Sequence, residues 1–213
     1  MQETTSREKI LKKVRNALMN KPDLSAENVD WNRPVYAEMP DPVDIAFAKE
    51  LNRIGGKFLY CEGHAEFAGA LEALIEEREW KNIFCLEPAI QDFLLHHNIS
   101  YRNKEDDFAE MTMGLTGCEF LVARLGSVMV SSAHKSGRRI NVFPETHLVM
   151  AYASQIVPDL KQALKGIRQR YAGNFPSMVS LITGPSRTAD IEKTLVMGAH
   201  GPKELIVFLI EDR

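Results

Sequence analysis

Hydrophobic and polar positions in residues 41–99 switch repeatedly between helical and strand spacing. The pattern predicts five elements: a helix at 43–54, a strand at 57–61, a helix at 66–78, a strand at 82–86 and a helix at 88–97. Helices that alternate with short apolar strands are typical of βαβ units, whose strands run parallel and are covered on both faces. This part of the chain therefore predicts an α/β fold with a mainly parallel sheet flanked by helices.

The pattern changes in the middle of the chain, where two apolar runs, 118–125 and 127–132, meet at Gly126. A glycine between two strand-like runs indicates a turn, so we expect mixed strand directions around this position. Further elements are expected as strands at 148–153, 178–182 and 204–210 and as a helix at 158–171. We therefore assign residues 41–213 to one α/β domain.

Residues 1–40 have a different pattern. Thr5 and Glu8 have the spacing of a capping box, and a narrow apolar stripe follows, formed by Ile10, Val14, Ala17 and Leu18. A helix is therefore expected at 5–20, whereas residues 22–42 contain four prolines and little periodicity. We interpret residues 1–40 as a helical arm with an extended connector. The basic face of this helix fits a solvated surface, an acidic partner or a membrane surface.

Composition narrows the class of protein. Hydrophobic residues make up 45% of the 213 residues, and the formal net charge is -3. Because nucleic-acid binders carry a basic surface, we expect no nucleic-acid partner. Apolar runs stay well short of the ~20 residues of a membrane span, and residues 1–6 lack the basic and apolar regions of a signal peptide. We expect a globular cytoplasmic protein without a membrane span.

The three cysteines, Cys61, Cys85 and Cys118, lie far apart in the sequence. This odd, scattered set predicts buried thiols and neither a disulfide framework nor a Cys-x-x-Cys metal knuckle. The sequence also lacks the glycine-rich fingerprints of dinucleotide- and phosphate-binding loops, the His-Glu-x-x-His zinc motif and the Gly-x-Ser-x-Gly elbow. We therefore predict no metal site and no cofactor in this chain.

The first candidate site lies at residues 183–192. The apolar strand 178–182 leads into Gly184-Pro185, and helical spacing resumes over 188–196. A helix N-terminus leaves backbone N–H groups unpaired and positively polarised, and with Arg187 beside it can seat a phosphate or carboxylate. The same residues also fit a plain helix cap followed by an acidic first turn. The candidate ligand-binding residues here are Gly184, Ser186, Arg187 and Thr188.

The second candidate is the polar loop 131–139, which holds three cationic side chains and His134. These residues suit an acidic ligand or an acidic protein surface, and an ordinary solvated turn has the same composition. His147 and His200 also lie in or beside polar loops, where a histidine can act as acid, base or donor. The candidate ligand-binding residues of this group are Arg138, Arg139 and His200. The last two are expected to face one cleft with residues 184–188.

Four stretches stand out together: Gly114–Ala123, Leu125–Val130, Arg138-Arg139 with Phe143–Val149, and Thr183–Glu192 followed by His200–Pro202. Their order and spacing resemble the lactate utilisation protein C family, which is built on the LUD domain. The resemblance covers residues 5–211 and is densest from residue 114 onward, and the run Ile182–Glu192 is specific to the family.

The resemblance implies a fold similar to the NagB/RpiA/CoA transferase-like superfamily, with residues 41–213 as an LUD-type domain behind an N-terminal helical arm. It also implies a role in oxidising L-lactate to pyruvate, together with two partner proteins that hold iron–sulfur clusters. Family membership leaves the chemical role of the C component open. Three roles are compatible with the sequence: binding of a small organic anion, non-catalytic assembly or regulation of the partners, and stand-alone transferase or ligase activity.

One position departs from the family pattern. Where members commonly read Ala-Glu-Thr-Gly-Thr, this chain has Ala123-Arg124-Leu125-Gly126-Ser127. CoA transferases, distant members of the superfamily, use a carboxylate nucleophile, which position 124 does not supply here. Glu119 lies close in sequence, but strand spacing places residues 119 and 124 on opposite faces.

Overall fold

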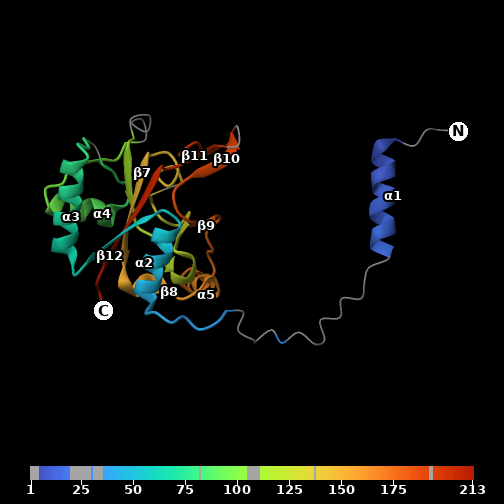
Figure 1. The fold of residues 1–213 in the computed structure, drawn as a ribbon, viewed down its shortest axis with the longest axis horizontal. Coiled ribbons are helices and arrows are strands. Elements are labelled where there is room, and N and C mark those ends of the chain that lie inside the picture. Colours follow the sequence, from blue (N-terminus) through green and yellow to red (C-terminus); the bar gives the residue numbers. More distant parts are fainter. Residues whose placement is uncertain are drawn as a thin grey trace. The chain divides into compact units, whose positions relative to one another are not determined.

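The computed structural model describes residues 5–19, 30, 36–81, 83–104, 111–136, 138–191 and 194–213. The chain divides into two compact units, Met1–Glu38 and Met39–Arg213. In the first unit the helix α1 spans Ser6–Met19, and none of its residues is buried (Figure 1). The predicted capping box is present, since Glu8 N donates to Thr5 Oγ1 at 3.4 Å. Most of the connector predicted before residue 41 lies outside the described residues.

The second unit is built around a six-stranded parallel sheet (Figure 1). Its strands, in spatial order, are β1 (Lys57–Cys61), β12 (Glu204–Ile210), β7 (Thr146–Tyr152), β4 (Met113–Thr116), β2 (Ile83–Phe84) and β3 (Tyr101–Arg102). Each neighbouring pair is parallel. The prediction of a mainly parallel sheet is therefore confirmed, and the carboxyl ends of all six strands lie at one edge.

Helices and a second sheet cover both faces of this sheet, as alternate side chains of β12 show. Leu205 and Val207 pack in one core cluster with α2 (Val43–Arg53), whereas Ile206 and Phe208 pack in another with α3 (His64–Glu77) and α4 (Pro88–His96). In Figure 1, α3 and α4 lie on one side of the sheet and α2 on the other. A parallel strand covered on both faces needs a continuous apolar sequence, which is the pattern of residues 204–210.

The second sheet has four strands in the order β8 (Ile156–Val157), β5 (Phe120–Val122), β6 (Ser127–Ser131) and β9 (Val179–Ile182). β6 is antiparallel to both β5 and β9, whereas β5 and β8 are parallel. The expected mixed directions around Gly126 are therefore confirmed. The helix α5 (Leu160–Arg170) covers the outer face of this sheet with Ala163 and Ile167.

Gly126 fixes the distance between the β5–β6 turn and α2. Its φ of 59° lies in the left-handed region, and a Cβ at this position would lie 2.4 Å from the backbone nitrogen of Leu51. A side chain here would therefore meet rigid backbone instead of a movable side chain. The glycine is required because the turn and the helix touch at their backbones.

The predicted helix at 188–196 is wrong, because this segment contains a β-hairpin. β10 (Arg187–Ile191) pairs antiparallel with β11 (Thr194–Met197), and Thr188 lies opposite Val196. β-branched residues supply the physical reason, since they lose side-chain freedom in a helix and pack well on an extended strand. The helix N-terminus on which the first candidate anion site depends is therefore not there.

No helix in the described part of the chain is both long enough and apolar enough to cross a membrane.

Candidate functional site

A pocket of about 350 Å³ lies at the carboxyl edge of the six-stranded sheet. Residues that follow its strands line the pocket: His64 comes after β1, Glu87 after β2 and Gly117 after β4, while Tyr152 ends β7. His134, from the loop after β6, completes the polar wall. In open α/β sheets, ligands bind in crevices outside the carboxyl ends of the strands. We call this cavity the carboxyl-edge pocket.

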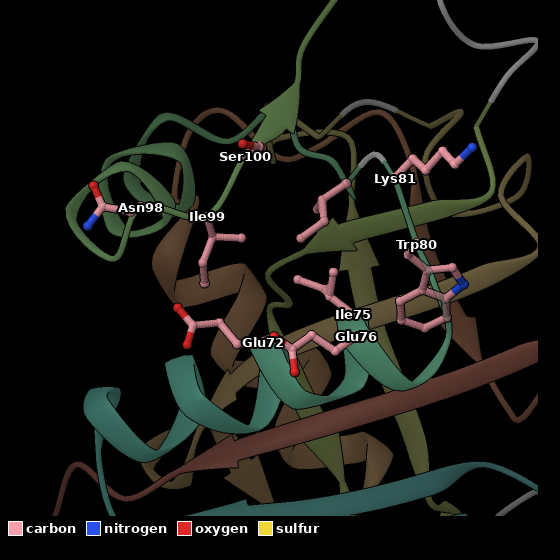
Figure 2. Close-up of a pocket in the computed structure, with 9 residues that line it drawn as sticks. Glu72, Ile75, Glu76, Trp80, Lys81, Asn98, Ile99 and Ser100 are labelled. Carbon is pink, nitrogen blue, oxygen red and sulfur yellow. The ribbon is translucent and has the colours of Figure 1, made fainter.

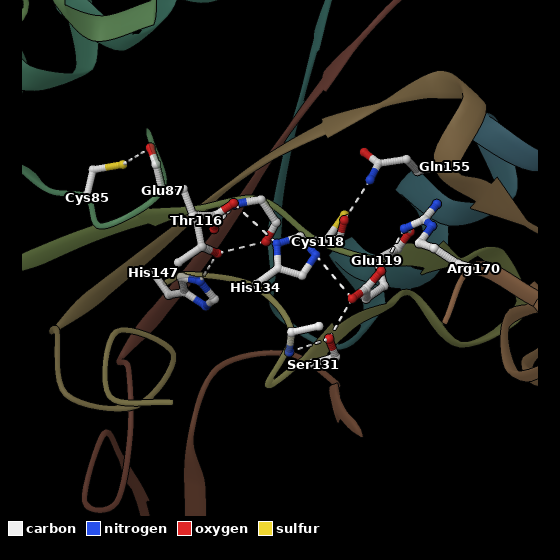
Figure 3. A network of polar contacts seen from close by, with 12 residues as sticks. Cys85, Glu87, Thr116, Cys118, Glu119, Ser131, His134, His147, Gln155 and Arg170 are labelled. Atoms are coloured by element: carbon white, nitrogen blue, oxygen red, sulfur yellow. Dashed lines mark hydrogen bonds and ion pairs between the residues drawn. The ribbon is translucent and has the colours of Figure 1, made fainter. Parts of the chain in front are cut away.

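Behind the pocket, Glu119 forms the centre of a buried polar network (Figure 3). Its carboxylate is fully buried just before β5. It accepts hydrogen bonds from Ser131 Oγ at 2.5 Å, Tyr171 OH at 2.9 Å and an Arg170 nitrogen at 2.6 Å. A buried carboxylate needs this number of donors, because an unpaired charge away from water is very unfavourable.

His134 connects Glu119 to the pocket. Its Nε2 lies 3.3 Å from Glu119 Oε1, and its Nδ1 lies 3.2 Å from Glu87 Oε2 (Figure 3). The other oxygen of Glu87 accepts a hydrogen bond of 2.8 Å from the backbone N–H of Gly117. The order of groups is therefore a buried carboxylate, a histidine and a second carboxylate that borders the pocket.

The electrostatics of this arrangement follow from its hydrogen bonds. Burial alone would raise the pKa of Glu119, but hydrogen bonds from His134, Ser131 and Tyr171 outweigh burial and lower the pKa to about 2. Hydrogen bonds to Glu119 and then Glu87 raise the pKa of His134 to about 9, against the opposing effect of burial. At neutral pH His134 is therefore an imidazolium held between two carboxyl groups.

The other residues that line the pocket are less charged. His64 Nε2 lies 3.0 Å from the hydroxyl of Tyr152, and apolar side chains, Ile90 and Phe93 among them, complete the lining. Cys118 also borders the pocket, but burial raises the pKa of its thiol far above the usual range. The thiol is therefore protonated at neutral pH and is a poor nucleophile.

His147 lies close in the fold but has a structural role. Its Nε2 lies 2.9 Å from Thr116 Oγ1, and burial lowers its pKa to about 4. Thr116 Oγ1 donates to Gly117 O at 3.0 Å, so it accepts from a neutral His147. Of the three histidines singled out as chemical candidates, the structure places His134 in the carboxyl-edge pocket, buries His147 and leaves His200 exposed.

Gly184 and Arg187 lie near the opposite, amino edge, against the turn before β1. Gly184 has a φ of 80°, and Arg187 donates a hydrogen bond to the carbonyl oxygen of Ile54, which caps α2. This guanidinium therefore holds the end of a helix, where cations are favourable.

The remaining candidate ligand-binding residues lie in different parts of the fold. Ser186 N donates to Pro202 O at 2.8 Å, which places it beside the 200–202 segment that precedes β12, and Thr188 lies in the hairpin. Arg138 donates to Ser177 Oγ at 3.1 Å. Arg139 is exposed, and its shared cleft with residues 184–188 and His200 stays a prediction.

Arg124 lies in the short 3₁₀ turn Ala123–Leu125 between β5 and β6. Its backbone N–H donates to Pro158 O at 3.1 Å. Glu119 lies at the other end of β5, about five residues or ~16 Å of extended chain away. The departure from the family pattern at position 124 therefore leaves the carboxyl-edge pocket intact.

A second pocket, of about 270 Å³, lies where β2 and β3 begin (Figure 2). Glu72 and Glu76 from α3 are exposed at this pocket, and Trp80 and Ile99 line it. Acidic side chains one helical turn apart on an exposed face are typical of a solvated surface. We call this cavity the amino-edge pocket.

Within the described residues, no group of three or more His, Cys, Asp or Glu side chains is arranged to hold a metal ion. At the carboxyl-edge pocket, the contacts of Glu119, His134 and Glu87 support proton exchange and hydrogen bonding. His134 was a candidate acid or base from the sequence, whereas Glu87 and the supporting role of Glu119 were not predicted. The available signal was a glutamate beside an apolar segment: Glu87 follows the apolar run 83–86, and Glu119 directly precedes β5.

The fold and this pocket define an α/β protein with a candidate site at the carboxyl edge of its main sheet. Residues 46–210 match the LUD domain family. A solved structure supports the fold alone: the crystal structure of a DUF162 family protein from Deinococcus radiodurans aligns with a TM-score of 0.56 and 16% identity, covering 79% of this chain and 96% of that one.

Curated relatives identify a family within the LUD domain family. Lactate utilization protein C from Bacillus subtilis (strain 168) is 39% identical over 106 residues, which cover 49% of this chain and 44% of the relative. The protein of the same name from Geobacillus thermodenitrificans (strain NG80-2) is 34% identical over 172 residues, covering 79% and 68%. The chain belongs to the LUD domain family and, within it, to the lactate utilisation protein C family. The alignments with the first relatives span less than half of their length.

Proposed function

We propose that this chain serves lactate utilisation by binding a small organic acid in the carboxyl-edge pocket. The names of its relatives support the lactate role. The observation that carries the binding role is the row of Glu119, His134 and Glu87, which brings a fixed charge pattern to the place where α/β sheets bind ligands. His134 can also exchange a proton with Glu87, which borders the pocket.

The electrons of lactate oxidation are proposed to pass through other proteins. Oxidation of L-lactate to pyruvate releases two electrons, which a flavin, a nicotinamide or metal clusters must accept. An iron–sulfur cluster takes four ligands, usually cysteine thiolates from a tight motif, whereas the three cysteines of this chain lie far apart in the sequence and are each buried. Two iron–sulfur partner proteins in the cytoplasm are therefore the proposed electron carriers.

An assembly role is the second candidate, and one observation favours it. The side chains of Ile10, Val14 and Leu18 on α1 are 61%, 49% and 57% exposed and form one stripe with four-residue spacing. Such a stripe suits the surface of another protein better than water. Stand-alone transferase or ligase activity rests on fold analogy and has no observation of its own.

The test is reconstitution. The chain is purified without oxygen, its visible spectrum is recorded, and lactate-dependent dye reduction is measured with and without the two partner proteins. We expect a colourless protein that is inactive alone, activity in the mixture, and at least a tenfold lower rate with His134→Gln. A stoichiometric chromophore or turnover by the chain alone would contradict the proposal. An unchanged rate with His134→Gln would favour the assembly role instead.

A further inference from the structure

The hydrogen-bonding capacity of Glu87 is only partly used. An ionised carboxylate offers four lone-pair positions. In the structure one oxygen accepts from Gly117 N and the other faces His134 Nδ1, which leaves one position on each oxygen. The Glu87 side chain borders the carboxyl-edge pocket and is 13% exposed. It therefore presents hydrogen-bond acceptors to whatever enters the pocket.

His134 does not offer a donor of its own to a ligand. Both ring nitrogens already face carboxylate oxygens, Glu119 at 3.3 Å and Glu87 at 3.2 Å. Glu119 is in turn held by Arg170 at 2.6 Å. The charges alternate along this row and cancel, so the wall is close to neutral as a whole but accepts hydrogen bonds at its surface.

We infer that the carboxyl-edge pocket selects the hydroxyl form of a small organic acid over its keto form, with Glu87 accepting the hydrogen bond of the hydroxyl group. This inference rests on the proposed organic-acid function. A hydroxyl group donates to a carboxylate, whereas a keto oxygen carries only lone pairs and is repelled by it. The site would thus bind a 2-hydroxy acid more tightly than the corresponding 2-oxo acid.

The rest of the pocket fits such a ligand. His64 and Tyr152 also line the pocket and are hydrogen-bonded to each other. Whichever of the two donates in this bond, the other keeps a polar hydrogen that can donate to a ligand carboxylate. Ile90 and Phe93 provide apolar contact for a short carbon chain. Glu119 acts as a positioning residue, because it fixes His134, and His134 fixes the orientation of Glu87.

The experiment compares three acids of the same size class. Lactate, pyruvate and propionate are titrated into the full chain, and binding is followed by protein-detected NMR, which measures even millimolar affinities. We expect lactate to bind at least tenfold more tightly than pyruvate, because one hydrogen bond to a charged group is worth about ten- to a hundredfold. Propionate, which has neither a hydroxyl nor a keto oxygen at its second carbon, should have an affinity between those of lactate and pyruvate.

The substitution Glu87→Gln provides the sharper test. The new amide can still accept from Gly117 N but turns N–H donors toward the pocket, so the preference for lactate over pyruvate should disappear or invert. Glu72→Gln, which removes the same charge at the amino-edge pocket, is the matched control and should leave the ratio unchanged. Thermal unfolding of each variant confirms that the fold is kept.

Different results separate this inference from the proposed function. If lactate and pyruvate bind equally, if neither binds, or if Glu87→Gln leaves the ratio unchanged, the inference is overturned. If the ratio behaves as expected while the reconstituted system does not oxidise lactate, the proposed function fails and the selectivity of the pocket stands.

Discussion

The two edges of the six-stranded sheet carry charge in different ways. At the carboxyl edge, Glu119 is fully buried and its neighbours Ser131, His134, Arg170 and Tyr171 all bring donors to it. At the amino edge, Glu145 and Lys203 form a pair of 2.8 Å whose side chains remain 62% and 55% exposed. Water and salt screen the second pair, whereas the first network is shielded from both. Glu119 and Glu145 are therefore expected to contribute very different amounts to the free energy of unfolding.

The largest expected difference between the edges is in stability. Glu119→Gln removes the charge that compensates His134 and Arg170, so it should lower the free energy of unfolding by about 3–5 kcal/mol. Glu145→Gln makes the same chemical change in an exposed pair and should cost about 0–1 kcal/mol. Urea unfolding of the two variants measures both values. Equal losses in the two variants would show that burial does not increase the contribution of Glu119 to the free energy of unfolding.

A second difference should appear in the pH dependence of stability. The folded-state pKa of Glu119 is lowered to about 2, so its contribution is present above pH 4.5 and is lost as the pH falls toward 2. The folded-state pKa of His134 is raised to about 9, so its contribution is present below pH 6.5 and is lost as the pH rises through 9. We expect a loss of roughly 1–3 kcal/mol on each side of this range.

Urea unfolding between pH 3 and 10 measures this profile. His134→Gln should flatten the alkaline side, whereas Glu145→Gln should leave both sides unchanged. Arg170 keeps its charge over the whole range, and the pKa of Tyr171 is raised by burial and by Glu119, so neither produces the loss between pH 6.5 and 9. An alkaline loss that persists in His134→Gln would assign it to another group.

The smallest expected effect tests the amino edge as a ligand site. Arg187→Ala removes the hydrogen bond to Ile54 O at the end of α2 and should cost about 0.5–1.5 kcal/mol, with binding of organic acids unchanged. Arg187→Lys keeps the charge and should recover part of the loss. If Arg187→Ala instead abolishes binding while Glu87→Gln does not, the ligand site lies beside Gly184 and Arg187, two of the candidate ligand-binding residues from the sequence.

Local patterns predicted most of the elements but not their connections. The helices at 43–54 and 88–97 and the strand at 204–210 were recognisable because spacing and apolar content are local properties. Residues 188–196 were assigned to a helix because so short a segment fits helical and strand spacing equally well. Their β-branched residues favour the strands of the hairpin that the structure shows. The four-residue strand β4 was not recognised as a strand because it is too short to show a period.

The site could not be read from the sequence for a different reason. His134 and Glu87 are 47 residues apart, and Arg170 and Glu119 are 51 apart. Glu87 follows a strand of the parallel sheet, whereas Glu119 and His134 flank strands of the second sheet and Arg170 ends α5. These pairs meet only because the two sheets and α5 pack together, and that packing is long-range. A single sequence shows that each residue is polar and lies next to or at the end of a predicted element, but it does not show which ones are neighbours.

The position of β12 has a consequence for how this protein acquires its structure during synthesis. β1 pairs with β12 through Lys57 and Ile206, and β12 separates β1 from β7. Domains are made from the N-terminus onward, and contacts between distant segments form slowly because a long loop must close first. Residues 57–61 therefore have no strand partner in this sheet until residues 204–210 have been translated. The apolar side chains of β1 and β7 that pack on β12 stay uncovered until this late interior strand has been made. We therefore expect the nascent protein to be most prone to aggregation, and most accessible to chaperones, before residues 204–210 are translated.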